Sequence, residues 1–475
     1  MTKKTRFIIL LICAVLFLII TPYIVLYSLG YRIDFAERKI IATGGIYVRA
    51  LPSGADIIID YKIKNKTGFF SNAIFVQNLL PKLHNVFIKK TGYYDYQKSI
   101  LVKEKEVTKL ENVILFKQNI LFDLLENGVD YFSTAPDNNT LLVKKTESNT
   151  ANKNKINFEV INLTTKEKQN FSLIIKTLAK NEKIQFANWL IQWSNDSNKA
   201  LLNIKDDYFL LDFSLREPKI TNLAFLSGLK EPSFNPDNSD QIFFVKNKNL
   251  YLNSKEPILI LKNVISYQII PITSGIPEQV GIYQNITWFS DDGFLYGSDI
   301  EGKRINKISL QNFSIKKDSS YKITNVSSKI FLQEDDSLFL LNENLKIFEK
   351  FHSPVKTFKI SPDKQKILYF NNNEIFYSFL GSMNQNILLS KSPEKINDYY
   401  WLNNDYLIFN SGNKTTISEI NNKDNINTVT LSQVISLPDG KNIDIQKPKI
   451  FFNQQDKKLY ILTKDSLLVS EKLIP

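Results

Sequence analysis

The segment FKISPDKQKILYF at residues 358–370 carries the pattern that decides the fold. A short stretch of alternating apolar residues ends at Ser-Pro-Asp, and a second apolar run, Ile-Leu-Tyr, follows at 367–369. Proline fixes its own φ and aspartate accepts hydrogen bonds from nearby backbone amides, so this tripeptide favours a tight turn. The segment therefore predicts two antiparallel strands joined by that turn.

Similar turns, each ahead of an apolar strand, recur after about residue 118. They lie at 131–137, 193–196, 234–237 and 288–293, with fainter copies at 327–341, 400–409 and 450–462. Asp137 and Asp196 are 59 residues apart, and Asp196 and Asp237 are 41 apart. A propeller blade repeats at about 40–45 residues, and insertions fall in its loops. This period indicates repeated four-stranded units.

The repeats resemble the blades of TolB-like and WD-type β-propellers. One four-stranded sheet cannot bury both of its faces, whereas blades packed around an axis cover one another. We therefore expect an all-β region with a β-propeller of seven or eight blades over residues 118–475. A strand near residues 120–122 would close the ring, and a set of unrelated β-sandwiches is the alternative.

An uncharged stretch from Phe7 to Leu29 lies between Arg6 and Arg32. Its length gives about 35 Å of helix, enough to cross a hydrocarbon core of about 30 Å. The run is longer than the apolar core of a secretory signal, and no A-x-A-like site follows it. The stretch predicts one transmembrane helix at 7–29, in contact with the lipid bilayer, rather than a cleaved signal peptide.

The orientation of this helix follows from its flanks. Lys3, Lys4 and Arg6 precede the helix, but Arg32 and other basic residues follow it, so the positive-inside rule gives only a weak preference. A short basic tail followed by the whole folded mass suits export of the C-terminal region. We expect residues 1–6 to be a cytoplasmic tail in a single-pass protein of the cell membrane, with the C-terminal region extracytoplasmic.

Residues 45–117 show short alternating segments separated by turn residues, which predicts a small β-sandwich. Strand-like residues flank the turn Pro52-Ser53-Gly54-Ala55 and run on to Asp60, and a Gly-Tyr pair follows at 92–93. With the stretch LPKLHNV at 80–86 and a closing strand at 110–115, this order resembles the PEGA domain. The departures from the family pattern are Ser53, Tyr61 and Lys82.

The resemblance implies a binding or packing module of a bacterial cell envelope, and it brings no catalytic residues. His84 lies in the stretch that matches a His-containing segment of the family. Because it stands beside the start of a strand, we expect His84 to be a turn or cap residue rather than a ligand.

The composition removes most classes of chemistry. Cys13 is the only cysteine, so no intramolecular disulfide is possible, and His84 and His352 are the only histidines. His352 lies in a predicted link between repeats, and no nucleophile elbow, phosphate-binding loop or zinc spacing occurs. The acidic pairs at 291–292 and 335–336 lack the register of a calcium loop, so we expect capped turns. We therefore predict no catalytic, cofactor-binding or metal-binding residues; the binding residues stay unassigned.

The formal net charge of +12 is spread over scattered lysines, which favours a basic solvated surface and no specific nucleic-acid site. The sequence then allows three functions. The first is a membrane-anchored, non-catalytic envelope protein whose propeller binds a protein or an envelope polysaccharide. The second is a propeller enzyme acting on envelope glycan, with carboxylates paired only in space. The third is a structural component of a surface layer.

Overall fold

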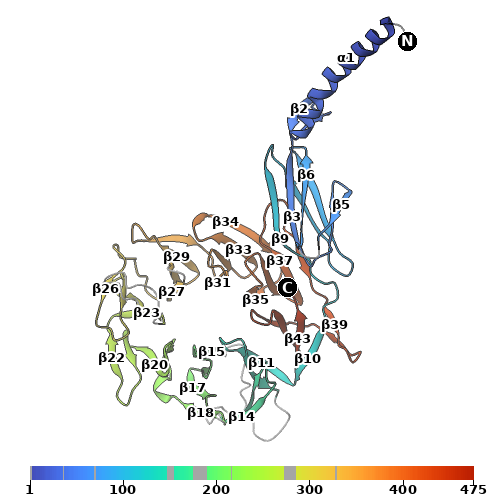
Figure 1. Cartoon of the computed structure of the whole chain (residues 1–475). Coiled ribbons are helices and arrows are strands. Elements are labelled where there is room, and N and C mark those ends of the chain that lie inside the picture. The colour runs from blue at the N-terminus through green and yellow to red at the C-terminus, as the bar shows by residue number, and fades with distance from the viewer. Residues whose placement is uncertain are drawn as a thin grey trace.

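The computed structural model describes residues 3–35, 37–68, 71–146, 155–174, 190–215, 217–229, 231–271, 285–326 and 329–475. In Figure 1 an N-terminal helix, a β-sandwich and a ring of small sheets follow one another in space, as they do in the sequence. Apart from that helix and one short 3-10 turn at Ala224–Leu226, the regular structure of the described residues consists of strands.

Helix α1 runs from Lys3 to Ser28, and its apolar side chains are exposed. In the described part of the chain it is the one helix long and apolar enough to cross a membrane. It starts four residues before the predicted Phe7, because lysine and arginine are good helix formers. It ends one residue before the predicted Leu29, because Gly30 takes a φ of 83°, a left-handed geometry that stops a helix.

Two sheets form the sandwich that follows. A short hairpin of β1 (Tyr31–Asp34) and β2 (Lys39–Ala42) links it to the helix. One sheet has the order β6-β3-β9 and the other β5-β4-β7-β8. Their strands are β3 (Gly44–Leu51), β4 (Asp56–Ile59), β5 (Lys62–Lys66), β6 (Ala73–Leu79), β7 (Leu83–Lys89), β8 (Tyr96–Leu101) and β9 (Val107–Ile114). Alternate residues of β3 and β4, including Val48 and Ile57, are fully buried between the sheets, as period-two patterning requires.

Eight further four-stranded antiparallel sheets occur among the described residues, and each is one blade of a ring. Blade 1 has β11 (Val129–Thr134), β12 (Thr140–Lys145), β13 (Lys155–Asn162) and β14 (Lys168–Ile174). Blade 2 has β15 (Leu190–Trp193), β16 (Lys199–Ile204), β17 (Asp207–Asp212) and β18 (Lys219–Asn222). Blade 3 has β19 (Ser233–Asn235), β20 (Asn238–Lys246), β21 (Asn249–Leu252) and β22 (Ile258–Leu261). Blade 4 has β23 (Val264–Ile269), β24 (Ile286–Ser290), β25 (Leu295–Ser298) and β26 (Asn306–Lys307).

The second half of the ring is built in the same way. Blade 5 has β27 (Tyr321–Val326), β28 (Lys329–Glu334), β29 (Ser337–Leu341) and β30 (Phe348–His352). Blade 6 has β31 (Thr357–Ile360), β32 (Lys366–Phe370), β33 (Glu374–Phe379) and β34 (Ser382–Lys391). Blade 7 has β35 (Ile396–Trp401), β36 (Tyr406–Ser411), β37 (Lys414–Glu419) and β38 (Thr428–Thr430), and a small hairpin of β39 (Val434–Ser436) and β40 (Asn442–Asp444) follows it.

Blade 8 closes the ring with strands from both ends of the propeller. It has β41 (Lys449–Asn453), β42 (Lys458–Thr463) and β43 (Ser466–Lys472), and its outermost strand is β10 (Phe122–Asn127). Phe122 pairs with Ser470 and Asn127 with Ser466. The predicted closing strand is thus confirmed, two residues further along than residue 120, and the blade number is eight.

The cores of the ring lie between blades rather than within them. Eight clusters of buried apolar residues each join two successive blades, including one between blade 8 and blade 1. Leu202 of blade 2, for example, packs in one cluster with Phe158 of blade 1, while its neighbour Leu201 packs with Phe244 of blade 3. Successive strand residues point to opposite faces, so each blade serves two clusters. This mutual covering excludes the alternative of unrelated sandwiches.

The sandwich is fastened to blades 7 and 8. Ile114 and Phe116 at its end belong to the same apolar cluster as Tyr406 of blade 7. The buried Lys98 ammonium forms an ion pair with the buried Glu419 of blade 7. The last residues of the sandwich therefore join the apolar cluster that lies between blades 7 and 8.

Candidate binding site

The turn after the first strand of a blade is built by the same hydrogen bonds in different blades. In blade 6 the Ser361 hydroxyl donates to Asp363 (2.5 Å) and accepts the amide of Lys366 (2.9 Å). In blade 2 the Ser194 hydroxyl donates to Asp196 in the same way (2.6 Å). The Ser-x-Asp signature of the sequence is therefore a turn-closing device, and its side chains are used inside the turn.

These turns also contact the next blade. The amide of Asp363 donates to the side chain of Asn404 in blade 7 (3.0 Å), and the amide of Asp137 donates to Ser197 in blade 2 (2.9 Å). These contacts tie the ends of neighbouring first strands together. The inward side chains of these strands form the wall of a central channel.

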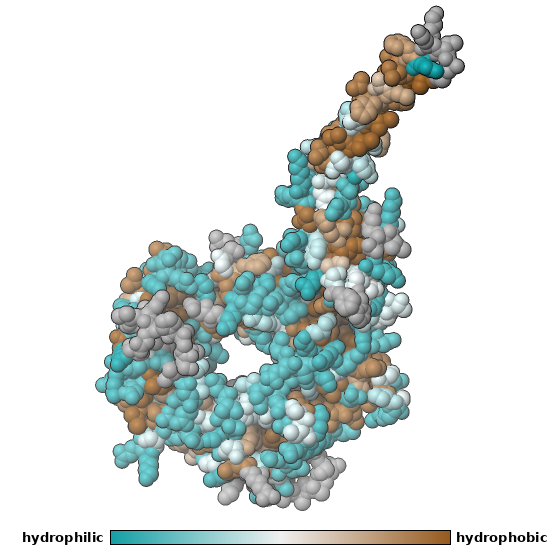
Figure 2. All heavy atoms as spheres, in the orientation of Figure 1, coloured by the Kyte–Doolittle hydropathy of each residue, from teal (hydrophilic) through white to brown (hydrophobic). Residues whose placement is uncertain are grey.

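The channel has a volume of about 1530 Å³ and opens through the ring, as the space-filling view shows (Figure 2). Aromatic side chains from several blades line it, namely Trp193, Tyr267, Phe358, Tyr400 and Phe451. Side-chain amides also line it, namely Gln192, Gln268, Gln333 and Gln454. Flat apolar faces beside amide donors and acceptors are the usual chemistry of a site that orients a polar ligand.

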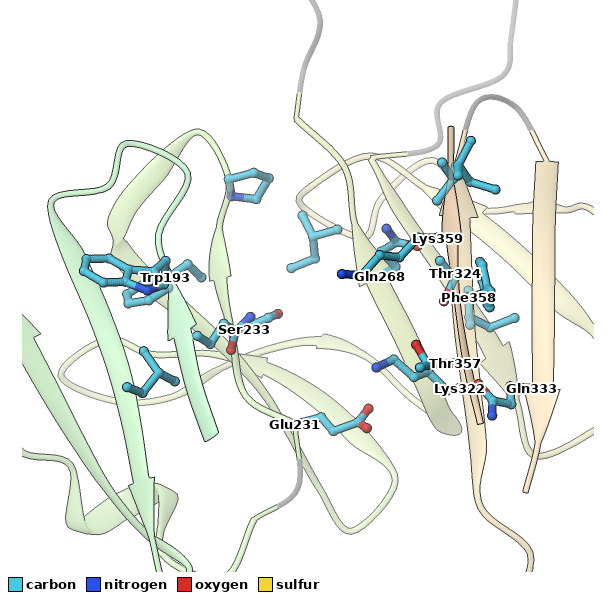
Figure 3. Close-up of a pocket in the computed structure, with 18 of the residues that line it drawn as sticks. Trp193, Glu231, Ser233, Gln268, Lys322, Thr324, Gln333, Thr357, Phe358 and Lys359 are labelled. Carbon is cyan, nitrogen blue, oxygen red and sulfur yellow. The ribbon is translucent and has the colours of Figure 1, made fainter. Parts of the chain in front are cut away.

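The aromatic residues of the wall are held in fixed orientations. The Trp193 indole donates to the Ser133 hydroxyl (3.0 Å), and its ring lies 5.5 Å from that of Phe213. Figure 3 shows Trp193 on one side of the cavity and Lys322 on the other. Glu231 also extends into this space, and both charged side chains are exposed.

Three charged residues lie on the first strands of blades 6, 7 and 8. Lys359 donates to the Tyr399 carbonyl (2.7 Å), and its ammonium lies 3.7 Å from the centre of the Tyr400 ring. Lys449 donates to the Phe132 carbonyl (3.1 Å). The intervening Asp398 accepts a hydrogen bond from the Ile450 amide (3.1 Å). Each lysine therefore bridges two blades through a backbone carbonyl.

Burial shifts the pKa values of these three charged residues. Desolvation lowers the pKa of Lys359 and of Lys449 to about 8, although Asp398 opposes the shift. Burial likewise raises the pKa of Asp398, against the hydrogen bond from Ile450 and the two lysines. The ammonium groups are thus easier to deprotonate than ordinary lysines, and the positive charge of this part of the ring depends on pH above neutrality.

The structure corrects the prediction for His84. It is a buried residue within β7, not a turn or cap residue, and both ring nitrogens are engaged. Nδ1 contacts the Asp60 carboxylate (2.6 Å) and Nε2 contacts the Leu80 carbonyl (2.8 Å). Burial would raise the pKa of Asp60, but hydrogen bonds from His84 and the Asn85 amide outweigh it and lower that pKa. His84 thus joins the end of one strand to the loop before another.

His352 was predicted to lie in a link between repeats, and that is wrong. It is the last residue of β30 in blade 5, with its ring 4.9 Å from that of Tyr369 and 5.1 Å from that of Phe376 in blade 6. Desolvation by these neighbours, with a contribution from Lys350, lowers its pKa. His352 is packed between blades 5 and 6 because it belongs to a strand, and that strand lies against the adjacent sheet.

The acidic pairs lie in turns and bind protein groups. Asp292 accepts the Phe294 amide (3.0 Å) and the Tyr296 hydroxyl (2.7 Å). Asp335 accepts the amide of Ser320 (2.8 Å), and the neighbouring Asp336 lies 3.8 Å from the ammonium of a lysine. Within the described ranges no three His, Cys, Asp or Glu side chains are grouped so as to hold a metal ion.

Sequence reasoning missed the residues of the channel wall. Lys359 lies within the stretch that decided the fold, but only its place in a strand was deduced there. Lys359 lies two residues before Ser361, where its turn begins. Tyr400 and Phe451 lie at the same position relative to their own turns, and all three residues line the channel. Alignment of the repeats on their turns was the signal that could have identified these positions.

No protein-family model matches the chain, and no curated protein matches it. The chain is similar to solved β-propeller structures. One is a Dos1 propeller, with 12% identity and a TM-score of 0.45 over 74% of this chain and 95% of that one. Another is the virginiamycin B lyase of Staphylococcus aureus, with 13% identity and a TM-score of 0.38 over 75% of this chain and 99% of that one. Such low scores carry no argument about function.

Proposed function

We propose that this protein is a membrane-anchored binding protein that holds an extended protein segment or an envelope polymer in its propeller channel. The observation that carries the proposal is the channel itself, an open space of about 1530 Å³ with fixed aromatic and amide walls. Side chains on separate blades converge on this space, and a ligand within it would contact several blades at once.

The arrangement of the parts supports an extended ligand. Figure 2 looks through the channel while the helix and the sandwich are seen from the side. We call α1 and the sandwich together the stalk. The channel therefore runs across the long axis of the stalk rather than along it. If α1 stands in the bilayer, a polymer lying along the membrane surface would meet the channel end-on.

The other parts have supporting roles in this proposal. Helix α1 is the anchor, and the sandwich, whose sequence resembles a PEGA domain, is the spacer that sets the height of the propeller. We place the propeller on the extracytoplasmic side of the cell membrane. Labelling intact cells with a membrane-impermeant maleimide tests this placement, in a Cys13→Ser chain carrying Tyr61→Cys, because the Tyr61 side chain is 80% exposed. Labelling only after lysis would overturn it.

Binding is tested with the full chain in nanodiscs against arrays of glycans and extended peptides. The Trp193→Ala and Lys322→Ala variants should each lose at least about tenfold in affinity for the ligand found, about 1.4 kcal/mol. Tyr61→Ala is the matched control, since it removes an exposed aromatic residue far from the channel. Thermal unfolding confirms that each variant is folded. Equal affinity of the channel variants and the wild type would refute the proposal.

One observation favours the enzyme alternative. The Glu231 carboxylate is exposed and extends into the cavity, where it could act on a bound glycan. Incubation with the glycans that bind, followed by product analysis, separates the two functions. Cleavage that is lost in Glu231→Gln would support the enzyme, whereas binding without cleavage supports a binding protein. Assembly of the purified chain with rising concentration would instead indicate the surface-layer role.

A further inference from the structure

The hairpin of β1 and β2 is an amphipathic element directly after the membrane helix. Ile33 pairs with Ile40 across the two strands, so their side chains share one face, and Asp34 pairs with Lys39 on the other. The Ile33 and Ile40 side chains are 42% and 56% exposed, and Phe35 at the turn is 84% exposed. The hairpin thus presents a small apolar face that the described residues leave exposed.

This exposure is confined to the outer part of the hairpin. At its base Ile41 and Ala42 are buried, and the Thr43 amide donates to the Gly30 carbonyl (2.9 Å), which ties the end of the hairpin to the end of the helix. A two-stranded hairpin is at best marginally stable in water without a third strand or a packing partner. The apolar face therefore needs a cover, which no other residue in the described part of the chain provides.

The hairpin also packs beside the last turn of α1. The Arg32 guanidinium donates to the Tyr27 carbonyl (2.8 Å) and lies 3.5 Å from the centre of the Tyr27 ring. Aromatic residues occur at every fourth position, at 23, 27, 31 and 35. The aromatic residues at the end of the helix therefore continue into the hairpin. Aromatic and basic residues together are typical of the membrane–water interface.

We propose that the hairpin is a second membrane contact, which lies in the interfacial region of the lipid bilayer with Ile33, Phe35 and Ile40 among the lipid chains. The occupant of this face is phospholipid, because the hairpin packs beside the last turn of α1, whose apolar side chains are also exposed. Arg32 then lies at the level of the phosphates. The contact fixes the rotation and tilt of the stalk, which a single helix leaves free. This proposal rests on α1 being the anchor.

Site-directed fluorescence tests the proposal, since Cys13 is the only cysteine and Cys13→Ser makes the chain free of thiols. A polarity-sensitive dye is placed at Phe35→Cys or Ile40→Cys, and the protein is reconstituted in phosphatidylcholine nanodiscs. Both labels should lose emission when the lipid carries a nitroxide near the head group. The matched control is Lys39→Cys, one residue from Ile40 but on the opposite face, and it should be quenched less.

The possible outcomes distinguish a failure of the hairpin contact from a failure of the membrane anchor. Dye on Tyr61→Cys marks the water-exposed level, and dye on native Cys13 marks the bilayer interior. Quenching of the labels at 35 and 40 no greater than at 61, with Cys13 still quenched by deep nitroxides, would overturn the hairpin contact alone. An unquenched Cys13 label would overturn the anchor. Two apolar-face positions keep the test valid if one variant misfolds.

Discussion

Replacement of Glu419 by Gln should destabilise the junction between the sandwich and the propeller. The Glu419 carboxylate is buried and accepts hydrogen bonds from the Lys98 ammonium, the Tyr96 hydroxyl (2.9 Å) and the Asn427 amide (2.9 Å). The Lys98 side chain is only 1% exposed, and burial lowers its pKa even with Glu419 beside it. The variant leaves that ammonium inside the protein with neutral acceptors alone, the amide oxygen of the new glutamine and the Asn421 carbonyl (2.7 Å).

The magnitude follows from the cost of an uncompensated buried charge. Removal of one partner of a buried ion pair costs about 3–5 kcal/mol. By contrast, Lys98→Met combined with Glu419→Gln leaves no buried charge, so the double variant should regain most of the loss. The control is Asp95→Asn, which breaks an exposed pair with Lys89 in the same sandwich (2.6 Å) and should cost less than about 1 kcal/mol.

The assay is urea unfolding of the full chain in detergent, followed by tryptophan fluorescence and by far-ultraviolet circular dichroism. All four tryptophans lie in the propeller region of the sequence, so fluorescence reports the ring and dichroism reports the whole chain. Glu419→Gln should lower the free energy of unfolding and separate the two transitions. If it unfolds like the wild type, or if the double variant is no more stable than the single one, the junction does not depend on this ion pair.

Three further predictions concern the ring. Asp363→Ala removes the acceptor that closes the blade 6 turn and should cost about 1–3 kcal/mol in thermal unfolding, more than loss of an exposed aspartate. Phe122→Ala empties a buried site in the closing strand and should cost about 3–5 kcal/mol; a smaller cost than Leu121→Ala, which removes a 63% exposed side chain, would contradict the closure. Because Lys359 and Lys449 have folded-state pKa values of about 8, below 10.5, the unfolded chain binds more protons between these values and stability should rise with pH across that window. The melting temperature should rise less in Lys359→Gln/Lys449→Gln, and an unchanged profile would refute the assignment.

The features that recur in each blade could be predicted from the sequence. The Ser-Pro-Asp turn at 361–363 could be deduced from three residues, because proline, aspartate and serine close a turn through contacts with their immediate neighbours. A strand near 120–122 was predicted to close the ring, and β10 does so by pairing with β43 of blade 8. The spacing of Asp137 and Asp196 is long because their repeat carries extra chain, which left the blade number open.

Features that join distant segments could not be deduced in this way. His84 lies 24 residues from Asp60, and the contact exists only because β4 and β7 are neighbours in one sheet. Lys98 and Glu419 are separated by 321 residues, and no local pattern marks either as an interface residue. In a strand where apolar and polar residues alternate, a lysine is expected to face solvent. Only the folded structure shows that the surface on which it lies is covered.

The channel and the proposed contact of the hairpin with the membrane together suggest why the parts are joined so firmly. A binding ring on a freely rotating stalk would present its channel in every direction, and an extended ligand lying on the membrane would meet it only by chance. The buried pair of Lys98 and Glu419 fixes the ring on the sandwich, and the hairpin contact with lipid would fix the sandwich on the membrane. The two contacts predict a joint effect: Glu419→Gln and a Phe35→Ser change should each weaken binding to a surface-bound polymer while leaving binding to short soluble fragments unchanged. Equal losses for fragments and polymer would show that orientation does not contribute.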